Sequence, residues 1–136
     1  MLVAIEKIGF EPSIRQSDLL KQAAAIKQDL PANVESLLNR GAPILIYFGA
    51  PWCGACKIME RTTFQDEEVI QALDRLQYLK VDVEQDVHTG AAFAVSAVPM
   101  IVVLDDQGSE RYRHVGPLTA DEMRLVLVQF TKTVRN

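Results

Sequence analysis

The chain has 136 residues, the length of a single domain, and a domain of this size buries roughly two-thirds of the surface of its unfolded chain. We therefore expect one domain over residues 1–136. The formal net charge of -4 and the pI of about 5.1 argue against a nucleic-acid partner. The longest apolar runs are far shorter than the ~20 residues of a membrane-spanning helix, so no membrane span is expected.

The first residues contain no basic leader, long apolar stretch or cleavage site, and they do not predict a signal peptide. As it stands, the sequence predicts a cytoplasmic protein. A periplasmic chain that begins after a removed leader would look the same, and two cysteines fit either compartment.

The first 42 residues predict an extension made of a strand and helices. Residues 2–8 contain enough β-formers for a short strand, and Ser17 is a suitable cap for a helix that runs to about Ile26. Pro31 interrupts that helix and can begin a second one, which stops near Gly41. Residues 43–48 are almost all apolar, as expected for a strand that is buried on both faces.

The rest of the chain alternates between helices and strands up to a terminal hairpin and helix. We predict helices over residues 53–62, 66–76 and 85–94, and strands over residues 78–83, 100–104 and 110–115. Residues 105–108 have turn chemistry, and Thr119 with Glu122 has the spacing of a capping box before the last helix. This order predicts an α/β fold with a mixed sheet that helices cover on both faces.

Both cysteines and the single tryptophan lie in one motif, WCGACK, at residues 52–57. Two cysteines separated by two residues fit on the first turn of a helix, where they can close and reopen a disulfide. Cys53 would lie at the helix N-terminus, whose unpaired N–H groups and dipole favour a thiolate. We expect the sulfur of Cys53 to be exposed and easily ionised, and that of Cys56 to be more buried and to act later.

Two other uses of the cysteine pair fit the sequence less well. A structural disulfide would close a loop of very few residues and remove little entropy from the unfolded chain. A zinc site could recruit His88 and His114, but their spacing fits no zinc finger or ribbon. A redox pair is the favoured interpretation, and no metal or cofactor beyond this redox-active disulfide is expected.

These motifs resemble the thioredoxin-fold thiol-disulfide oxidoreductases. The shared features are the cysteine motif after a buried strand, Val81-Asp82-Val83, Val98-Pro99 before a strand, the Gln107-Gly108 turn, and Val115-Gly116 before the last helix. The resemblance covers residues 43–130, which would form the thioredoxin core, with residues 1–42 as an extension. Glu60 and the stretch TFQD at residues 63–66 are similar to the C-terminal domain of the periplasmic reductase DsbD and its single-domain relatives.

The resemblance implies that the Val98-Pro99 peptide bond is cis and faces the cysteines. The backbone of Val98 would pair with an extended substrate, and an apolar rim for that substrate would surround Cys53, formed by Pro51, Trp52, Val98, Pro99 and Gly116. Pro99 could instead be an ordinary trans proline at the start of a strand, and Trp52 could be a core residue.

One position departs from the family pattern. Many thioredoxins carry a buried aspartate six residues before the first cysteine, and this chain has Tyr47 there. Glu60 follows Cys56 by one helical turn and could accept the proton of the second thiol, so Cys53, Cys56 and Glu60 are the candidate catalytic residues. Glu60 could equally be a solvated helix residue, Tyr47 is expected to pack, and Lys57 could favour a thiolate or simply be exposed.

The expected function is thiol-disulfide exchange, with a protein disulfide reductase favoured because Gly54 and Ala55 offer no polar side chain to hold the thiolate. A monomer is expected, and its expected partners are protein disulfide substrates and an upstream thiol reductant. The alternative is a binding or chaperone-like module that holds client proteins on the apolar rim.

Overall fold

The structure, a computed structural model, describes residues 30–135. The strand predicted over residues 2–8 and the helix predicted after Ser17 lie outside the described residues.

Four strands form one mixed sheet in the order β3-β2-β4-β5. Their bounds are β2 (Ile44–Gly49), β3 (Gln77–Asp82), β4 (Met100–Leu104) and β5 (Glu110–Val115). β2 pairs with β3 in parallel and with β4 in antiparallel, and β4 and β5 form the predicted hairpin. The parallel pair requires a crossover, which the helices between β2 and β3 provide.

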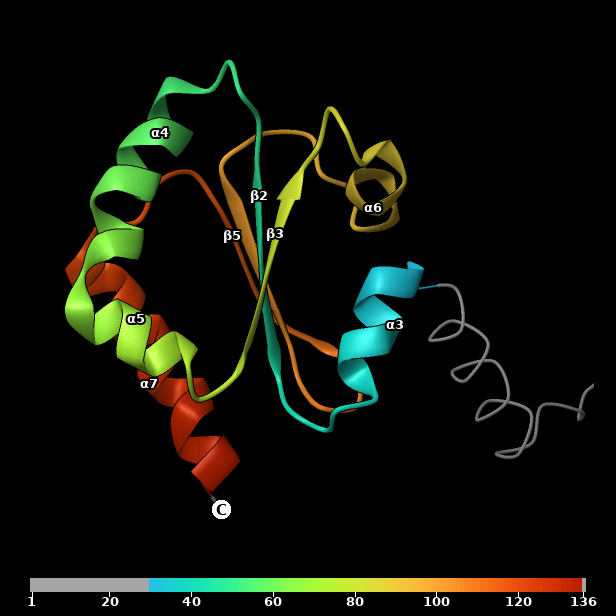
Figure 1. Cartoon of the computed structure of the whole chain (residues 1–136), viewed down its shortest axis with the longest axis vertical. Coiled ribbons are helices and arrows are strands. Elements are labelled where there is room, and N and C mark those ends of the chain that lie inside the picture. Colours follow the sequence, from blue (N-terminus) through green and yellow to red (C-terminus); the bar gives the residue numbers. More distant parts are fainter. Residues whose placement is uncertain (1–29, 136) are drawn as a thin grey trace, which may run out of the picture. The chain divides into compact units, whose positions relative to one another are not determined.

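Helices cover both faces of this sheet, as predicted for a thioredoxin fold (Figure 1). On one face lie α4 (Gly54–Arg61), α5 (Glu67–Leu73) and α7 (Ala120–Arg135), and on the other lie α3 (Ala32–Leu38) and α6 (Val87–Ala92). A short 3₁₀ helix, η1 (Thr63–Gln65), joins α4 to α5 where the sequence predicted a break.

β2 is the centre of the core, since all six of its residues are buried. Leu45 and Tyr47 contribute to the hydrophobic cluster that also contains both cysteines. Phe48 points the other way and meets Phe93, with ring centroids 5.7 Å apart. Alternate side chains of β2 therefore pack against different helix layers, which explains the unbroken apolar run of its sequence.

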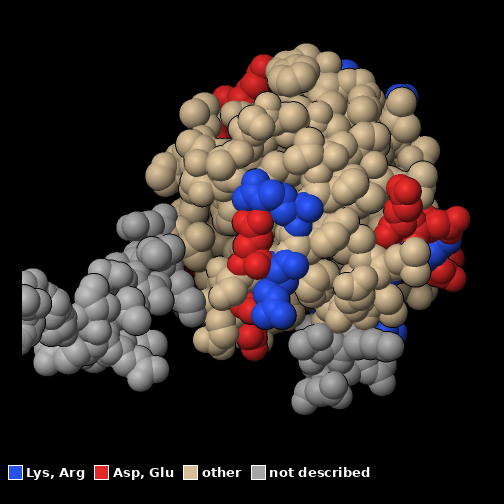
Figure 2. Space-filling view, turned by 180° about the vertical axis from the view of Figure 1, so that it is seen from behind, with Lys and Arg blue, Asp and Glu red and all other residues tan. Residues whose placement is uncertain are grey.

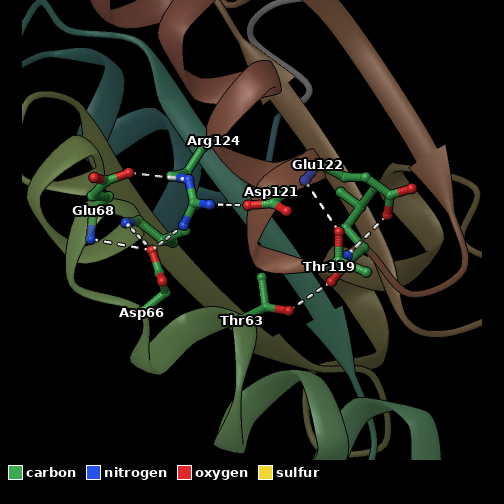
Figure 3. Close-up of polar contacts among 9 residues, drawn as sticks. Thr63, Asp66, Glu68, Thr119, Asp121, Glu122 and Arg124 are labelled. Atoms are coloured by element: carbon green, nitrogen blue, oxygen red, sulfur yellow. Dashed lines mark hydrogen bonds and ion pairs between the residues drawn. The ribbon is translucent and has the colours of Figure 1, made fainter.

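Polar contacts connect α7 to the segment that follows α4 (Figure 3). The guanidinium of Arg124 lies 2.8 Å from Asp66 and 3.1 Å from Glu68, and it also pairs with Asp121. Asp66 caps α5 by accepting hydrogen bonds from the N–H groups of Glu68 and Val69. Because Arg124 donates to it, the pKa of Asp66 lies below its ordinary value.

Helix ends differ from the predictions by a few residues. α5 ends at Leu73 rather than near Leu76, because the chain tightens there into i→i−3 bonds, as from Leu76 N–H to the Leu73 carbonyl at 3.2 Å. The capping box of α7 is confirmed: Thr119 N–H donates to Glu122 at 2.9 Å, and Glu122 N–H donates to the Thr119 hydroxyl at 3.2 Å.

Figure 2 shows a face that is mostly uncharged, on which basic and acidic side chains alternate in a short central column while further, mainly acidic side chains lie toward one edge. Within residues 30–135, no helix combines the length and the apolar character needed to cross a membrane.

Candidate functional site

Three segments that are distant in sequence meet at one edge of the sheet. The loop to α4 leaves β2 where Phe48 pairs with Met100, so this loop lies beside the residues that precede β4. Gly116, just past the end of β5, donates its N–H to the Pro99 carbonyl at 2.8 Å. The cysteine loop, the Val98-Pro99 segment and Gly116 are thus brought together by strand pairing.

Cys53 is the N-cap residue of α4 and forms a disulfide with Cys56, with 5.2 Å between their Cα atoms. The sulfur of Cys53 accepts a hydrogen bond from the Cys56 N–H at 3.0 Å. The first sulfur therefore lies where the helix dipole and the Cys56 N–H group stabilise negative charge. The same N–H group would stabilise a thiolate at Cys53 once the disulfide opens.

Cys53 is less exposed than the sequence predicted. The fractional exposure of the whole residue is 6% for Cys53 and 0% for Cys56. The difference arises because the disulfide and the hydrophobic cluster around Ala50 and Leu118 enclose the Cys53 side chain. The predicted order, with Cys56 behind Cys53, still holds.

The rim residues lie around this disulfide as follows. The Val98-Pro99 peptide bond is cis, as the family resemblance implied. Val98 packs against the cluster that contains both cysteines, and Gly116 has a φ of 110°, which a glycine adopts without strain. Trp52 is 66% exposed, which excludes a core role, and Pro51 is also exposed. Binding of substrate by this rim stays a prediction.

A small pocket of about 110 Å³ lies between Trp52 and the segment before the cis peptide. Its lining is largely apolar and consists of Trp52, Val83, Val95, Ser96, Ala97 and Val98. The indole N–H of Trp52 donates to the carboxylate of Glu84, which holds the ring beside this pocket. Glu84 was not predicted as a site residue, although its position just after the Val81-Asp82-Val83 motif could have indicated it.

Glu60 is not a freely solvated helix residue, because both of its carboxylate oxygens have a partner. Tyr47 donates its hydroxyl proton to Oε2 of Glu60 at 2.9 Å, and Nζ of Lys80 lies 3.5 Å from Oε1. The Tyr47 oxygen also lies 3.4 Å from the carbonyl oxygen of Cys56, beneath the turn of α4 that carries the second cysteine.

Tyr47 packs, as predicted, but it also has this polar contact, which the sequence did not predict. The residue is fully buried, and its ring lies 4.8 Å from that of Phe64. Burial and, next, the hydrogen bond to Glu60 raise the pKa of Tyr47 well above its ordinary value. The hydroxyl therefore remains a neutral donor at physiological pH.

A second pocket, of about 190 Å³, lies on the Glu60 side of the disulfide. Charges of both signs line it, since Lys57, Glu60, Lys80 and Asp82 face it together with Gly49, Ala50 and Pro51. Lys57 is exposed at this pocket. Across the described residues, no group of three or more histidines, cysteines or acidic residues is arranged to hold a metal ion.

A fold with a CXXC disulfide at the N-terminus of a helix and a cis proline beside it is typical of thioredoxin-like proteins. The sequence profile described as "Thioredoxin-like domain" matches residues 30–131, more than half of the chain. The chain therefore belongs to the thioredoxin-like family, and its Cys53–Cys56 disulfide fits the redox pair of the thiol-disulfide oxidoreductases in that family.

Individual relatives agree with this assignment. The chain is 28% identical over 110 residues to the thiol:disulfide interchange protein DsbD of Campylobacter jejuni, which covers 78% of this chain but 18% of that protein. Among solved structures, it is similar to Fasciola hepatica thioredoxin, with a TM-score of 0.63, 29% identity, and coverage of 73% of this chain and 92% of the other. The reduced C-terminal domain of Neisseria meningitidis DsbD gives a TM-score of 0.57 and 25% identity, with coverage of 83% and 96%.

Proposed function

We propose that this chain is a protein disulfide reductase that acts through a mixed disulfide. Cys53 thiolate attacks a sulfur of the substrate disulfide, that bond breaks, and one substrate sulfur leaves as a thiolate that takes up a proton. Cys56 then loses its proton, attacks the sulfur of Cys53, and releases the second substrate thiolate. The substrate gains two electrons, and the protein ends as the Cys53–Cys56 disulfide.

The position of the Cys53 sulfur carries this proposal. It caps α4 and receives the Cys56 N–H at 3.0 Å, so a thiolate there has a donor as well as the helix dipole. Gly54 and Ala55 add no polar side chain to this stabilisation. A moderately stabilised thiolate favours an electron donor, because a strong oxidant requires a strongly stabilised reduced form.

The remaining site residues have supporting roles in this proposal. Pro51, Trp52, Val98, Pro99 and Gly116 would receive an extended segment of the substrate, with the Val98 backbone as its pairing partner. Glu60 would accept the proton that Cys56 loses.

The partners proposed are of two chemical classes. Protein disulfides would be the substrates, and an upstream dithiol would reduce the Cys53–Cys56 disulfide again, as the interchange proteins named DsbD suggest. No metal or organic cofactor takes part in these steps.

Insulin reduction by dithiothreitol tests the reaction. We expect the chain to accelerate it, Cys53→Ser to abolish the acceleration, and Cys56→Ser to accumulate a mixed disulfide. A Cys53→Ser variant as active as the parent would favour the binding module. Equilibration with a thiol buffer should give a potential toward about -270 mV, and a value near -120 mV would reassign the chain as an oxidant.

A further inference from the structure

We propose that Tyr47 is a positioning residue that holds the Glu60 carboxylate so that it can take the proton of Cys56 and pass it to the adjoining pocket. This inference rests on the proposed function, because it concerns the second step of the exchange. The proton moves from the Cys56 thiol to Glu60 and then to water, while the Cys56 sulfur forms its bond to Cys53.

The sheet register brings the parts together. Tyr47 on β2 and Lys80 on β3 are direct partners across the parallel strand pair, and both side chains meet Glu60 on α4. Tyr47 holds Oε2 and Lys80 holds Oε1, so the carboxylate is fixed from two neighbouring strands. One turn before Glu60 on the same helix face stands Cys56.

The space for the tyrosine hydroxyl depends on a glycine. A Cβ atom at Gly49 would lie only 3.1 Å from the Tyr47 oxygen, which is tighter than nine in ten real Cβ contacts, so the tyrosine would have to shift. Gly49 also lines the pocket of about 190 Å³. The absence of a side chain there leaves room both for the hydroxyl and for water beside Glu60.

Charged groups from two elements, β3 and α4, lie near this carboxylate. Lys80 lies on β3, Lys57 lies on α4 itself, and Asp82 lines the pocket from the end of β3. Burial raises the pKa of Tyr78, and the nearby charge of Glu60 raises it further. Tyr78 makes no hydrogen bond to Glu60, however. Tyr78 is therefore a matched control for the loss of a tyrosine hydroxyl.

Two effects of Glu60 predict opposite results, which makes the test sharp. If Glu60 accepts the proton, Glu60→Gln slows the attack by Cys56, because general bases contribute about 100-fold or more when well placed. If Glu60 acts only through its charge, the same change speeds the attack, because a nearby negative charge disfavours a thiolate.

The experiment is a single-turnover reaction of the reduced chain with a chromogenic aromatic disulfide. The first aromatic thiolate leaves when Cys53 attacks, and the second leaves when Cys56 resolves the mixed disulfide, so the second rate constant isolates the step in question. It is measured against pH for the parent chain and for Glu60→Gln, Tyr47→Phe, Tyr78→Phe and the double variant Tyr47→Phe with Glu60→Gln.

We expect Glu60→Gln to slow the second release at neutral pH by about 100-fold and to flatten its pH profile. Tyr47→Phe should slow it severalfold, Tyr78→Phe should leave it unchanged, and Tyr47→Phe should have no further effect once Glu60 is replaced. Independent, additive losses, or a Tyr47→Phe profile equal to that of Tyr78→Phe, would overturn the positioning role. So would a faster second release in Glu60→Gln.

Failure of the reductase itself would look different. A parent chain that releases no second aromatic thiolate would contradict the exchange reaction, whatever the variants do. Circular dichroism and a urea titration of each variant confirm that the compared chains are folded during the assay. An unchanged second rate constant in Tyr78→Phe separates the effect of the Tyr47 hydroxyl from a general loss of packing.

Discussion

The buried hydroxyl of Thr63 connects two segments that pack near the disulfide. Thr63 is 2% exposed and donates its hydroxyl proton to the Leu118 carbonyl at 2.6 Å (Figure 3). Leu118 belongs to the same hydrophobic cluster as Cys53 and Cys56. This bond thus links the end of α4, through η1, to the loop that follows Gly116.

Replacing Thr63 by valine should lower the free energy of unfolding by about 1 to 2 kcal/mol, because the shape is kept while the Leu118 carbonyl loses its partner. Urea titration measures the change. Thr62→Val is the matched control: Thr62 is exposed and its hydroxyl donates within α4 to the Ile58 carbonyl at 2.7 Å. It should cost less than about 0.5 kcal/mol. Equal costs would contradict the importance of burial.

Residues close in sequence were easier to predict than residues brought together by packing. The Cys53–Cys56 pair follows from their spacing and from the helix that begins there. The hydrogen bond from Tyr47 to Glu60 depends on how α4 packs over β2, and the Lys80 contact depends on the register between β2 and β3. Neither the packing of α4 over β2 nor the register between β2 and β3 is encoded in a local sequence pattern. Tyr47 was therefore predicted only to pack, and the contact of Lys80 with Glu60 was not predicted.

At the scale of the element, α5 depends on a charged cap. Asp66 accepts two N–H groups at the start of the helix and receives a hydrogen bond from Arg124 of α7 at 2.8 Å. The Arg124 hydrogen bond is the main reason that the pKa of Asp66 is lowered, and the two cap bonds add to it. A carboxylate with a lowered folded-state pKa stabilises the fold above its unfolded pKa, and that contribution disappears as the pH falls through the folded value.

Asp66→Asn therefore should lower the melting temperature at neutral pH, and the difference from the parent chain should shrink as the pH falls below about 4. Asparagine keeps the cap, so the change isolates the charge. Glu67→Gln, one residue further along α5, is the control because Glu67 is exposed and has no side-chain partner in the described part of the chain. A pH-independent difference for Asp66→Asn would show that Arg124 contributes nothing through this carboxylate.

Element types followed well from the sequence, whereas some element ends did not. The apolar run of β2 and the acidic first turn of α5 are local signals that survive in the structure. The end of α5 at Leu73 is followed by Leu76, which is buried in the core just before β3 begins, and such a tertiary contact is not encoded in the local pattern. α6 is shorter than predicted for residues 85–94, since Asp86 caps it by accepting the Thr89 N–H at 3.0 Å.

For the whole molecule, the redox state and the stability are linked. A cysteine pair has a low reduction potential when the fold favours its disulfide form. It is a strong oxidant when the fold favours its reduced form. The proposed reductase should therefore unfold at a higher urea concentration when oxidised than after reduction by dithiothreitol.

The urea midpoint of each form measures this directly. A chain with both Cys53 and Cys56 replaced by serine is the control, because dithiothreitol should not move its midpoint. A reduced form more stable than the oxidised form would contradict the electron-donor assignment while leaving the thioredoxin-like fold intact.

The mixed sheet as a whole was predictable because strands that alternate with helices allow few topologies. The role of residues 1–42 as an extension, and the placement of the core at residues 43–130, stay predictions.

The charged side chains of β5 have a consequence for solubility. This strand lies at one end of the described sheet, and its exposed residues include Glu110, Arg111 and Arg113, with Arg113 and Glu110 paired at 2.7 Å. Adding a strand from a second copy would strip water from these charged side chains, which discourages pairing along this edge.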